Sequence, residues 1–361
     1  MNQNSSNMMR RHSRLKIFTG ILIPVCCLYF LMTRFINFDE VEVKESLNNG
    51  KPCLASLGPT MKENLEKVKS YSFPEAEKYI KELFPPSLPD ETSLPKMPVF
   101  VTAASASHYT EFMELLHNVS AVTDKYTDIK LIIYDLGLYK SQIKEIESVC
   151  KCSVKKFPFA DLPKHVKELK GYAWKPVAIQ LAAKDHPFVI WMDASVRFTT
   201  TDLDAHFERA RNLGVMATRG YAAIAMRTHP NTFRVFGEEA CTFKATNELE
   251  ATLILVYANK FVSEFFLKPW VSCALTYGCI VPESNSIRFI GCDRTDQQIY
   301  FDCHRFDQSA LSILMYRLYE KDIEHHKMNH SFFRFCKGAD EQWYFPQFIN
   351  ELMIKSHEKC F

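Results

Sequence analysis

The stretch Phe188-Val-Ile-Trp-Met-Asp-Ala-Ser-Val-Arg-Phe198 joins a fully apolar run to an acidic turn. Five consecutive apolar residues are typical of a strand that is buried on both faces of a parallel sheet. Asp193 follows at the point where this strand ends. Ligands of open parallel sheets bind beyond the carboxyl ends of the strands, so Asp193 is the first candidate functional residue.

Strands and helices alternate on both sides of this stretch. Apolar runs predict strands, and amphipathic patterns predict helices, at positions listed here in chain order: strand 99–103, helix 107–120, strand 129–134, helix 141–149, strand 152–157, helix 174–184, strand 188–192, helix 205–212 and helix 307–319. The alternation predicts an α/β domain with a mostly parallel sheet covered by helices on both faces. Asp135 follows the second strand and therefore belongs to the same edge of the sheet as Asp193.

The first 96 residues predict a membrane anchor and a spacer. A basic tail, residues 1–16, precedes a run with no charge from Ile17 to Thr33, and the apolar residues that follow extend a predicted transmembrane signal anchor over 17–38. A cleaved signal peptide is the alternative, but residues 35–39 contain no cleavage site of small residues. The basic flank places the N-terminus in the cytosol and the rest of the chain in the lumen of the Golgi or endoplasmic reticulum.

A proline-marked segment separates this anchor from the domain. Residues 39–96 contain a short charged helical stretch near 62–70, and five prolines lie between positions 85 and 98. Prolines at this density break helices and interior strands, which predicts a semi-rigid stem. Residues 97–361 then form a single lumenal domain.

Composition and missing motifs exclude several classes of function. The 361 residues are 47% hydrophobic and 24% charged, with a net charge of +2. This composition is ample for a packed core and lacks the basic excess of a nucleic-acid-binding protein. The chain contains no Gly-x-Ser-x-Gly, Gly-Lys-Ser/Thr phosphate loop or His-Glu-x-x-His sequence, so esterases, nucleotide hydrolases and zinc proteases lack their signatures.

The cysteines and two glycosylation motifs agree with a lumenal domain. Two of the twelve cysteines fall in the predicted span, and the other ten predict several disulfides whose pairing the sequence leaves open. Asn118-Val-Ser and Asn329-His-Ser are acceptor tripeptides for N-glycans.

Four segments carry a resemblance to a known family. They are Tyr134-Asp-Leu-Gly-Leu, Tyr172-Ala-Trp-Lys-Pro, Trp191-Met-Asp-Ala-Ser-Val-Arg-Phe and His304-Arg-Phe-Asp-Gln-Ser-Ala-Leu. With them the chain resembles glycosyltransferases of the GT-A fold, and in detail it is similar to the nematode family DUF1647. The resemblance implies transfer of a sugar from a nucleotide-sugar donor to a glycan, protein or lipid acceptor, with Mn²⁺ or Mg²⁺ as cofactor.

The resemblance also implies roles for individual residues. Asp193 matches the first carboxylate of a D-x-D motif that holds the donor diphosphate through the cation, while the third position is Ser195, a weaker cation ligand. Lys175 meets the donor phosphates, Asp135 belongs to the donor site and His304 completes the cation site. Asp307 and Gln308 contact the transferred sugar.

Each of these residues also has a purely structural interpretation. Asp193 also suits a strand-end turn, and Lys175 also suits a solvated surface. Asp307 is also a suitable N-cap for the helix 307–319, and His304 a surface residue beside Cys303. A literal D-x-D sequence, Asp202-Leu-Asp204, is assigned to the capping of the helix 205–212, and Trp174 to the core.

Two further functions compete with the glycosyltransferase. One is a membrane-anchored glycan-binding or scaffolding protein that has kept the fold and lost catalysis, which the serine at position 195 suggests. The other is a structural, disulfide-rich ectodomain, which the pattern of a buried parallel sheet disfavours.

Overall fold

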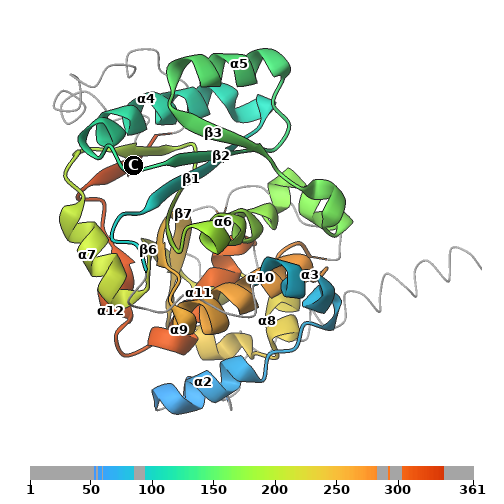
Figure 1. Ribbon diagram of the computed structural model, residues 1–361. Coiled ribbons are helices and arrows are strands. Elements are labelled where there is room, and N and C mark those ends of the chain that lie inside the picture. Colours follow the sequence, from blue (N-terminus) through green and yellow to red (C-terminus); the bar gives the residue numbers. More distant parts are fainter. Residues whose placement is uncertain are drawn as a thin grey trace, which may run out of the picture. The chain divides into compact units, whose positions relative to one another are not determined.

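The computed structural model describes residues 53, 56–58, 60–84, 94–282, 292 and 303–336, drawn in colour in Figure 1. They belong to one compact unit that begins at Cys53. The predicted tail 1–16 and span 17–38 lie outside the described residues. Within the described residues, no helix has both the length and the apolarity that a membrane crossing requires.

A seven-stranded sheet forms the centre of this unit. Its strands are β1 (Val99–Ala104), β2 (Leu131–Asp135), β3 (Cys152–Lys156), β4 (Phe188–Met192), β6 (Val215–Ala223), β7 (Asn247–Tyr257) and β8 (Lys327–Met328). They lie in the order β3-β2-β1-β4-β7-β6-β8. The first four in this order are parallel, β7 is antiparallel to both β4 and β6, and β8 is parallel to β6. The predicted mostly parallel sheet is confirmed.

The strand order creates a switch point between β1 and β4. From β1 the chain adds β2 and β3 on one side of the sheet and then returns to place β4 on the other side. The crossover connections on the two sides diverge here, and in open α/β sheets such a divergence leaves a ligand crevice beyond the carboxyl ends of the strands. Asp193, the residue after β4, lies at this edge.

Helices cover both faces of the sheet, as predicted (Figure 1). On one face, α4 (Tyr109–Lys125), α5 (Lys140–Val149) and α7 (Asp204–Leu213) bury their apolar sides in a shared core with alternate strand residues such as Phe100 and Ile190. On the other face, α6 (Trp174–Asp185) packs on β1 and β4, and α11 (Asp307–Tyr319) packs on β7. The helix α10 (Lys268–Leu275) contacts both α6 and α11.

The remaining elements are short. They are α8 (Pro230–Phe236), α9 (Lys260–Val262) and α12 (Ile323–His326), together with a two-stranded sheet in which β5 (Val196–Phe198) pairs antiparallel with β9 (Phe333–Phe335). At the start of α7, Asp202 accepts a hydrogen bond from the Asp204 N–H at 3.4 Å and forms an ion pair with Lys125. The literal D-x-D sequence therefore lies at a helix start, but the N-cap residue of α7 is Leu203 and no side chain caps the helix, so the predicted capping role is not confirmed.

Part of the predicted stem packs on the domain. Residues 60–84 form α2 (Met61–Lys69), the 3₁₀ turn Pro74–Ala76 and α3 (Glu77–Leu83). The helix α2 contacts α11, and α3 contacts α10 and α6. This packing differs from a semi-rigid spacer because the short helices bury apolar side chains, Val68, Ile80 and Leu83 among them.

Polar and covalent bonds add to this packing. Arg317 of α11 donates to Asn64 of α2 at 3.0 Å and pairs with the buried carboxylate of Glu238. A disulfide joins Cys53 to Cys241. Three more disulfides join described residues, in the pairs Cys150–Cys152, Cys273–Cys279 and Cys292–Cys303, which confirms the prediction of several disulfides.

The two glycosylation motifs have opposite surroundings. Asn118 is buried in α4, where its amide donates to the Phe198 carbonyl at 3.0 Å and accepts from the Phe198 N–H at 2.7 Å. A glycan on Asn118 would break these bonds and has no space in the core, so the structure corrects this predicted site. Asn329 is exposed and accessible.

Candidate functional site

Lys175 and Asp193 meet at the switch point. Lys175 lies in the first turn of α6, the helix that leads into β4, so the start of the helix and the end of the strand share one edge of the sheet. The Lys175 Nζ lies 3.0 Å from Oδ1 and 3.1 Å from Oδ2 of Asp193. The Trp191 indole N–H also donates to Asp193 Oδ1, at 2.8 Å. The Asp193 side chain keeps an exposed fraction of 27%, so one side of it faces solvent.

Asp307 approaches the same ammonium group from α11. Its Oδ2 lies 2.9 Å from Lys175 Nζ, and Nζ also donates to the Ala251 carbonyl of β7 at 3.1 Å. The Asp307 side chain is only 5% exposed, so its carboxylate is buried against the Lys175 ammonium. We call Lys175, Asp193 and Asp307 the acidic cluster.

The surroundings explain the electrostatics of the acidic cluster. Burial alone would lower the pKa of Lys175, but Asp193 and Asp307 together raise it above its ordinary value, so the ammonium is charged. Burial raises the pKa of Asp307, and Lys175 opposes this effect. The acidic cluster thus sets two carboxyl groups against one ammonium group.

A second polar network holds Gln308, the next residue of α11. Its Nε2 donates to Glu248 Oε2 at 2.8 Å, and its Oε1 accepts from Arg305 at 3.2 Å. Glu248 is buried in β7, and its other oxygen pairs with Arg227 at 2.8 Å. Gly220 of β6 makes room for it, because a Cβ there would lie 2.6 Å from the Glu248 Cγ and carbonyl oxygen. The carboxamide of Gln308 therefore has a fixed orientation.

Sequence reasoning missed Glu248, Arg227 and Arg305. The sequence holds little signal for Glu248, because the unbroken apolar run begins only at Leu253 and a second glutamate, Glu250, lies between them.

Two aromatic residues next to the acidic cluster have left-handed backbones. Tyr172 has φ 55° and Phe306 has φ 49°, and the centroids of their rings lie 5.7 Å apart. Phe306 directly precedes Asp307, and Tyr172 lies three residues before Lys175. Residues other than glycine in this region are strained, and such strain is concentrated at functional sites in proteins.

The other predicted site residues are bonded elsewhere. Asp135 Oδ1 accepts from the Gly137 N–H at 2.8 Å and the Leu138 N–H at 2.6 Å, so it organises the turn after β2 at the same edge of the sheet. Ser195 is half-buried, and its carbonyl accepts from the Cys336 N–H at 2.8 Å.

The structure does not place His304 in a cation site. Its Nδ1 accepts from the His229 N–H at 3.1 Å, and its Nε2 donates to the Ile280 carbonyl at 2.9 Å. Burial lowers the pKa of His304 to about 3, so the ring is neutral. Because both nitrogens are engaged with the backbone, its predicted role as a metal ligand is corrected to a structural one.

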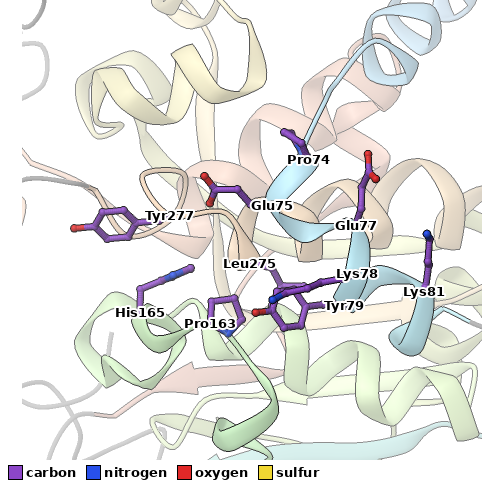
Figure 2. A pocket seen from close by; sticks show the side chains of 10 residues that line it. All are labelled: Pro74, Glu75, Glu77, Lys78, Tyr79, Lys81, Pro163, His165, Leu275 and Tyr277. Atoms are coloured by element: carbon purple, nitrogen blue, oxygen red, sulfur yellow. The ribbon is translucent and has the colours of Figure 1, made fainter.

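A groove of about 660 Å³ lies apart from the acidic cluster. Figure 2 shows its lining, which includes Glu75 and Lys78 from the α3 region together with His165 and Tyr277. No residue of the acidic cluster lines this groove. The candidate site is therefore the strand edge and not the groove.

Comparisons with solved structures found similarities at low sequence identity. The chain is similar to the galactosyltransferase LgtC in complex with donor and acceptor sugar analogs, at 15% identity and a TM-score of 0.31, over 48% of this chain and 59% of that one. The chain thus spans less than two thirds of LgtC. It is also similar to core-mannan synthase A of Aspergillus fumigatus in its Mn/GDP form, at 10% identity and a TM-score of 0.36, over 64% of this chain and 76% of that one.

A third structure and two sequence comparisons complete these findings. Mouse xyloside xylosyltransferase 1 is similar at 10% identity and a TM-score of 0.34, over 60% of this chain and 80% of that one. No curated protein matches the chain by sequence. The family DUF1647, described as a protein of unknown function, matches residues 78–180. This match over residues 78–180 confirms the resemblance that the motifs predict.

Proposed function

We propose that this protein is a glycosyltransferase that moves a sugar from a nucleoside-diphosphate sugar to a glycan, protein or lipid acceptor. The observation that carries the proposal is the acidic cluster at the switch point of the sheet. Parallel sheets bind nucleotides at such a point. The cluster combines the buried ammonium of Lys175 with a partly exposed carboxylate, that of Asp193.

The charge of the cluster supports a cation cofactor. Sugar transfer expels a nucleoside diphosphate, and the carboxyl groups of the acidic cluster offer this anionic leaving group no attraction of their own. Mg²⁺ and Mn²⁺ bind hard oxygen ligands, and Mg²⁺ sites commonly use one or two carboxylates together with substrate phosphates. Asp193 fits this requirement, because its carboxylate is partly exposed to solvent. We assign the cation to Asp193, with Ser195 beside it; when bound, it neutralises the developing charge of the diphosphate.

Asp307 and Gln308 suit the recognition of the transferred sugar. Asp307 is a buried carboxylate, which accepts hydrogen bonds from sugar hydroxyl groups. Glu248 and Arg305 preorganise the carboxamide of Gln308, and a fixed polar group costs no reorganisation during the reaction. Lys175 holds Asp193 and Asp307 together, and Asp135 remains a proposed contact of the donor.

We place this activity in the lumen of the Golgi or endoplasmic reticulum, with residues 17–38 as a signal anchor. The four disulfides support an oxidising compartment.

Turnover of nucleotide sugars tests the proposal. The full-length protein in mild detergent is incubated with a panel of UDP- and GDP-sugars, with Mn²⁺ or with EDTA, and release of the nucleotide is measured. We expect release with Mn²⁺ and its loss with EDTA and in Asp193→Asn. Asp202→Asn is the matched control, because it makes the same change in the literal D-x-D sequence. Absence of both binding and release across the panel would reject the proposed function.

A glycan-binding protein without catalysis is the second candidate. Ser195 replaces the second carboxylate of the D-x-D motif, and Lys175 already neutralises part of the remaining acidic charge. Binding of glycans without binding of any nucleotide sugar would favour this candidate.

A further inference from the structure

Tyr172 presents an exposed aromatic ring beside the acidic cluster. The residue is 39% exposed, whereas its aromatic neighbours Phe306 and Trp174 are only 7% and 8% exposed. The ring centroid of Tyr172 lies 5.7 Å from that of Phe306 and 6.3 Å from that of Trp174. Two buried rings therefore support one exposed ring.

Backbone contacts fix the position of this ring. The Tyr172 N–H donates to the Leu169 carbonyl at 3.3 Å, and the Tyr172 carbonyl accepts from the Lys175 N–H at 3.1 Å. The preceding residue, Gly171, is buried so closely against Val281 that a Cβ would lie 2.6 Å from its side chain. The two backbone hydrogen bonds and the packing of Gly171 therefore fix the left-handed conformation of Tyr172. The ring is preorganised, so a ligand does not have to order it on binding.

The ring lies close enough to contact a ligand of the acidic cluster. The Lys175 Nζ lies 5.5 Å from the centroid of the Tyr172 ring. Burial raises the pKa of the Tyr172 hydroxyl, so the ring is uncharged at neutral pH. An uncharged aromatic ring beside charged groups offers an apolar surface to a molecule that is otherwise bound by polar contacts.

We propose that Tyr172 is a stacking platform for a sugar ring of the acceptor, on which the apolar C–H face of a pyranose packs. The inference deepens the proposed function, because it states that the acceptor presents a carbohydrate at this subsite. The nucleoside of the donor is expected at the other side of the switch point, beyond β1 and β2. The transferred sugar is expected at Asp307 and Gln308, which are buried, so the exposed ring faces the molecule that enters from solvent.

Two substitutions at position 172 distinguish the effect of the aromatic ring from the effect of the left-handed backbone. Asparagine tolerates a left-handed conformation better than most residues, so Tyr172→Asn removes the ring with little added strain. Tyr172→Phe keeps the ring and removes the hydroxyl. Tyr277→Ala is the matched control, because Tyr277 is similarly exposed, at 45%, and lies in the separate groove of Figure 2.

Saturation-transfer NMR on the full-length protein measures the contact directly. The probes are the methyl α- and β-glycosides of glucose, galactose, mannose, N-acetylglucosamine and xylose. We expect at least one probe to receive saturation at the protons of one ring face, with wild type, Tyr172→Phe and Tyr277→Ala alike. In Tyr172→Asn we expect the affinity for that probe to fall roughly three- to tenfold, which corresponds to the free energy of one aromatic contact.

Nucleotide binding, measured in parallel by thermal shift, distinguishes the two proposals. Unchanged nucleotide binding in Tyr172→Asn, with weaker sugar binding, supports the platform. Equal sugar binding in Tyr172→Asn and wild type overturns it, as does a wild-type protein that saturates none of the probes. In either case the proposed function survives if nucleotide sugars still bind. If the wild-type protein binds none of the nucleotide sugars, the proposed function itself is rejected.

Discussion

At the scale of single residues, the site depends on one lysine that serves two carboxylates. Lys175 is the counter-ion of both Asp193 and Asp307 at about 3 Å, in a position where water cannot replace it. Removing one partner of a buried ion pair leaves an uncompensated charge. We therefore expect Lys175→Met to lower the free energy of unfolding by about 3–5 kcal/mol, measured by urea denaturation. Lys125→Met, which removes an exposed ion pair with Asp202, is the control, and an equal loss in both variants would contradict the role of Lys175.

His304 makes the stability of the protein depend on pH. Its pKa is about 3 in the folded state against an ordinary 6.5, because burial favours the neutral ring. Between these values the unfolded chain binds one proton more than the folded chain, so this residue stabilises the fold at neutral pH and the effect is lost as pH falls below 6.5. The slope is about 1.4 kcal/mol per pH unit for one proton. In His304→Gln, urea denaturation between pH 4.5 and 6 is expected to show a slope smaller by this amount, and an unchanged slope would refute the assignment.

The sequence identified several of these residues but not their contacts. Asp193 was a candidate because it lies at a strand end, which local patterns predict, whereas Lys175 and Asp307 were candidates through the family resemblance. Their convergence on one ammonium group depends on α11 packing across β7, a contact between distant segments. His304 was misinterpreted for the same reason, since its two partners are backbone groups of distant segments.

At the scale of elements, the strand β7 connects the sheet to the start of α11. Glu248 of β7 fixes Gln308, and Arg227 neutralises it from the other side. We expect Glu248→Gln to lower the free energy of unfolding by about 3 kcal/mol, because Arg227 loses its buried partner. Nucleotide binding is expected to persist while sugar transfer falls, since Asp193 is unaffected. Glu324→Gln, at an exposed ion pair, is the matched control; equal effects in both variants would argue against a positioning role for Glu248.

The elements that the sequence predicted and those that it missed differ in their patterns. Strands β1 to β4 are predicted within two residues. Three of them, β1, β2 and β4, are short and largely apolar runs between helices, whereas β3 has a mixed polar sequence. The helix α11 has its predicted bounds, 307–319. By contrast, β6 was not predicted: it contains Arg219 and Gly220, and its pairing with β7 is interrupted by register shifts there. Because β6 mixes polar and apolar residues and pairs in an irregular register, its sequence shows no clear hydrophobic period.

At the scale of the whole described unit, the disulfide between Cys53 and Cys241 joins the predicted stem region to the domain. It closes a loop with a sequence separation of 188 residues, whereas Cys150–Cys152 closes one of only 2. Closing a long loop restricts the unfolded chain much more. We expect the double variant Cys53→Ser/Cys241→Ser to lose about 2–5 kcal/mol of unfolding free energy, and Cys150→Ser/Cys152→Ser to lose much less. Urea denaturation of the oxidised proteins tests this order, and the reverse order would contradict it.

The glycosylation pattern links the fold to the proposed compartment. If the domain enters the secretory lumen, we expect the exposed Asn329 to receive a glycan. We expect none on the buried Asn118, because its amide both donates a hydrogen bond to Phe198 and accepts one from it. In protein produced in eukaryotic cells, digestion with an N-glycanase is expected to remove the mass of one glycan from wild type and from Asn118→Gln, and none from Asn329→Gln. Asn118→Gln should also lower stability, since the longer side chain cannot keep both hydrogen bonds. A protein without any glycan would contradict the lumenal location, whereas a glycan on Asn118 of the folded protein would contradict the packing of α4 against β5.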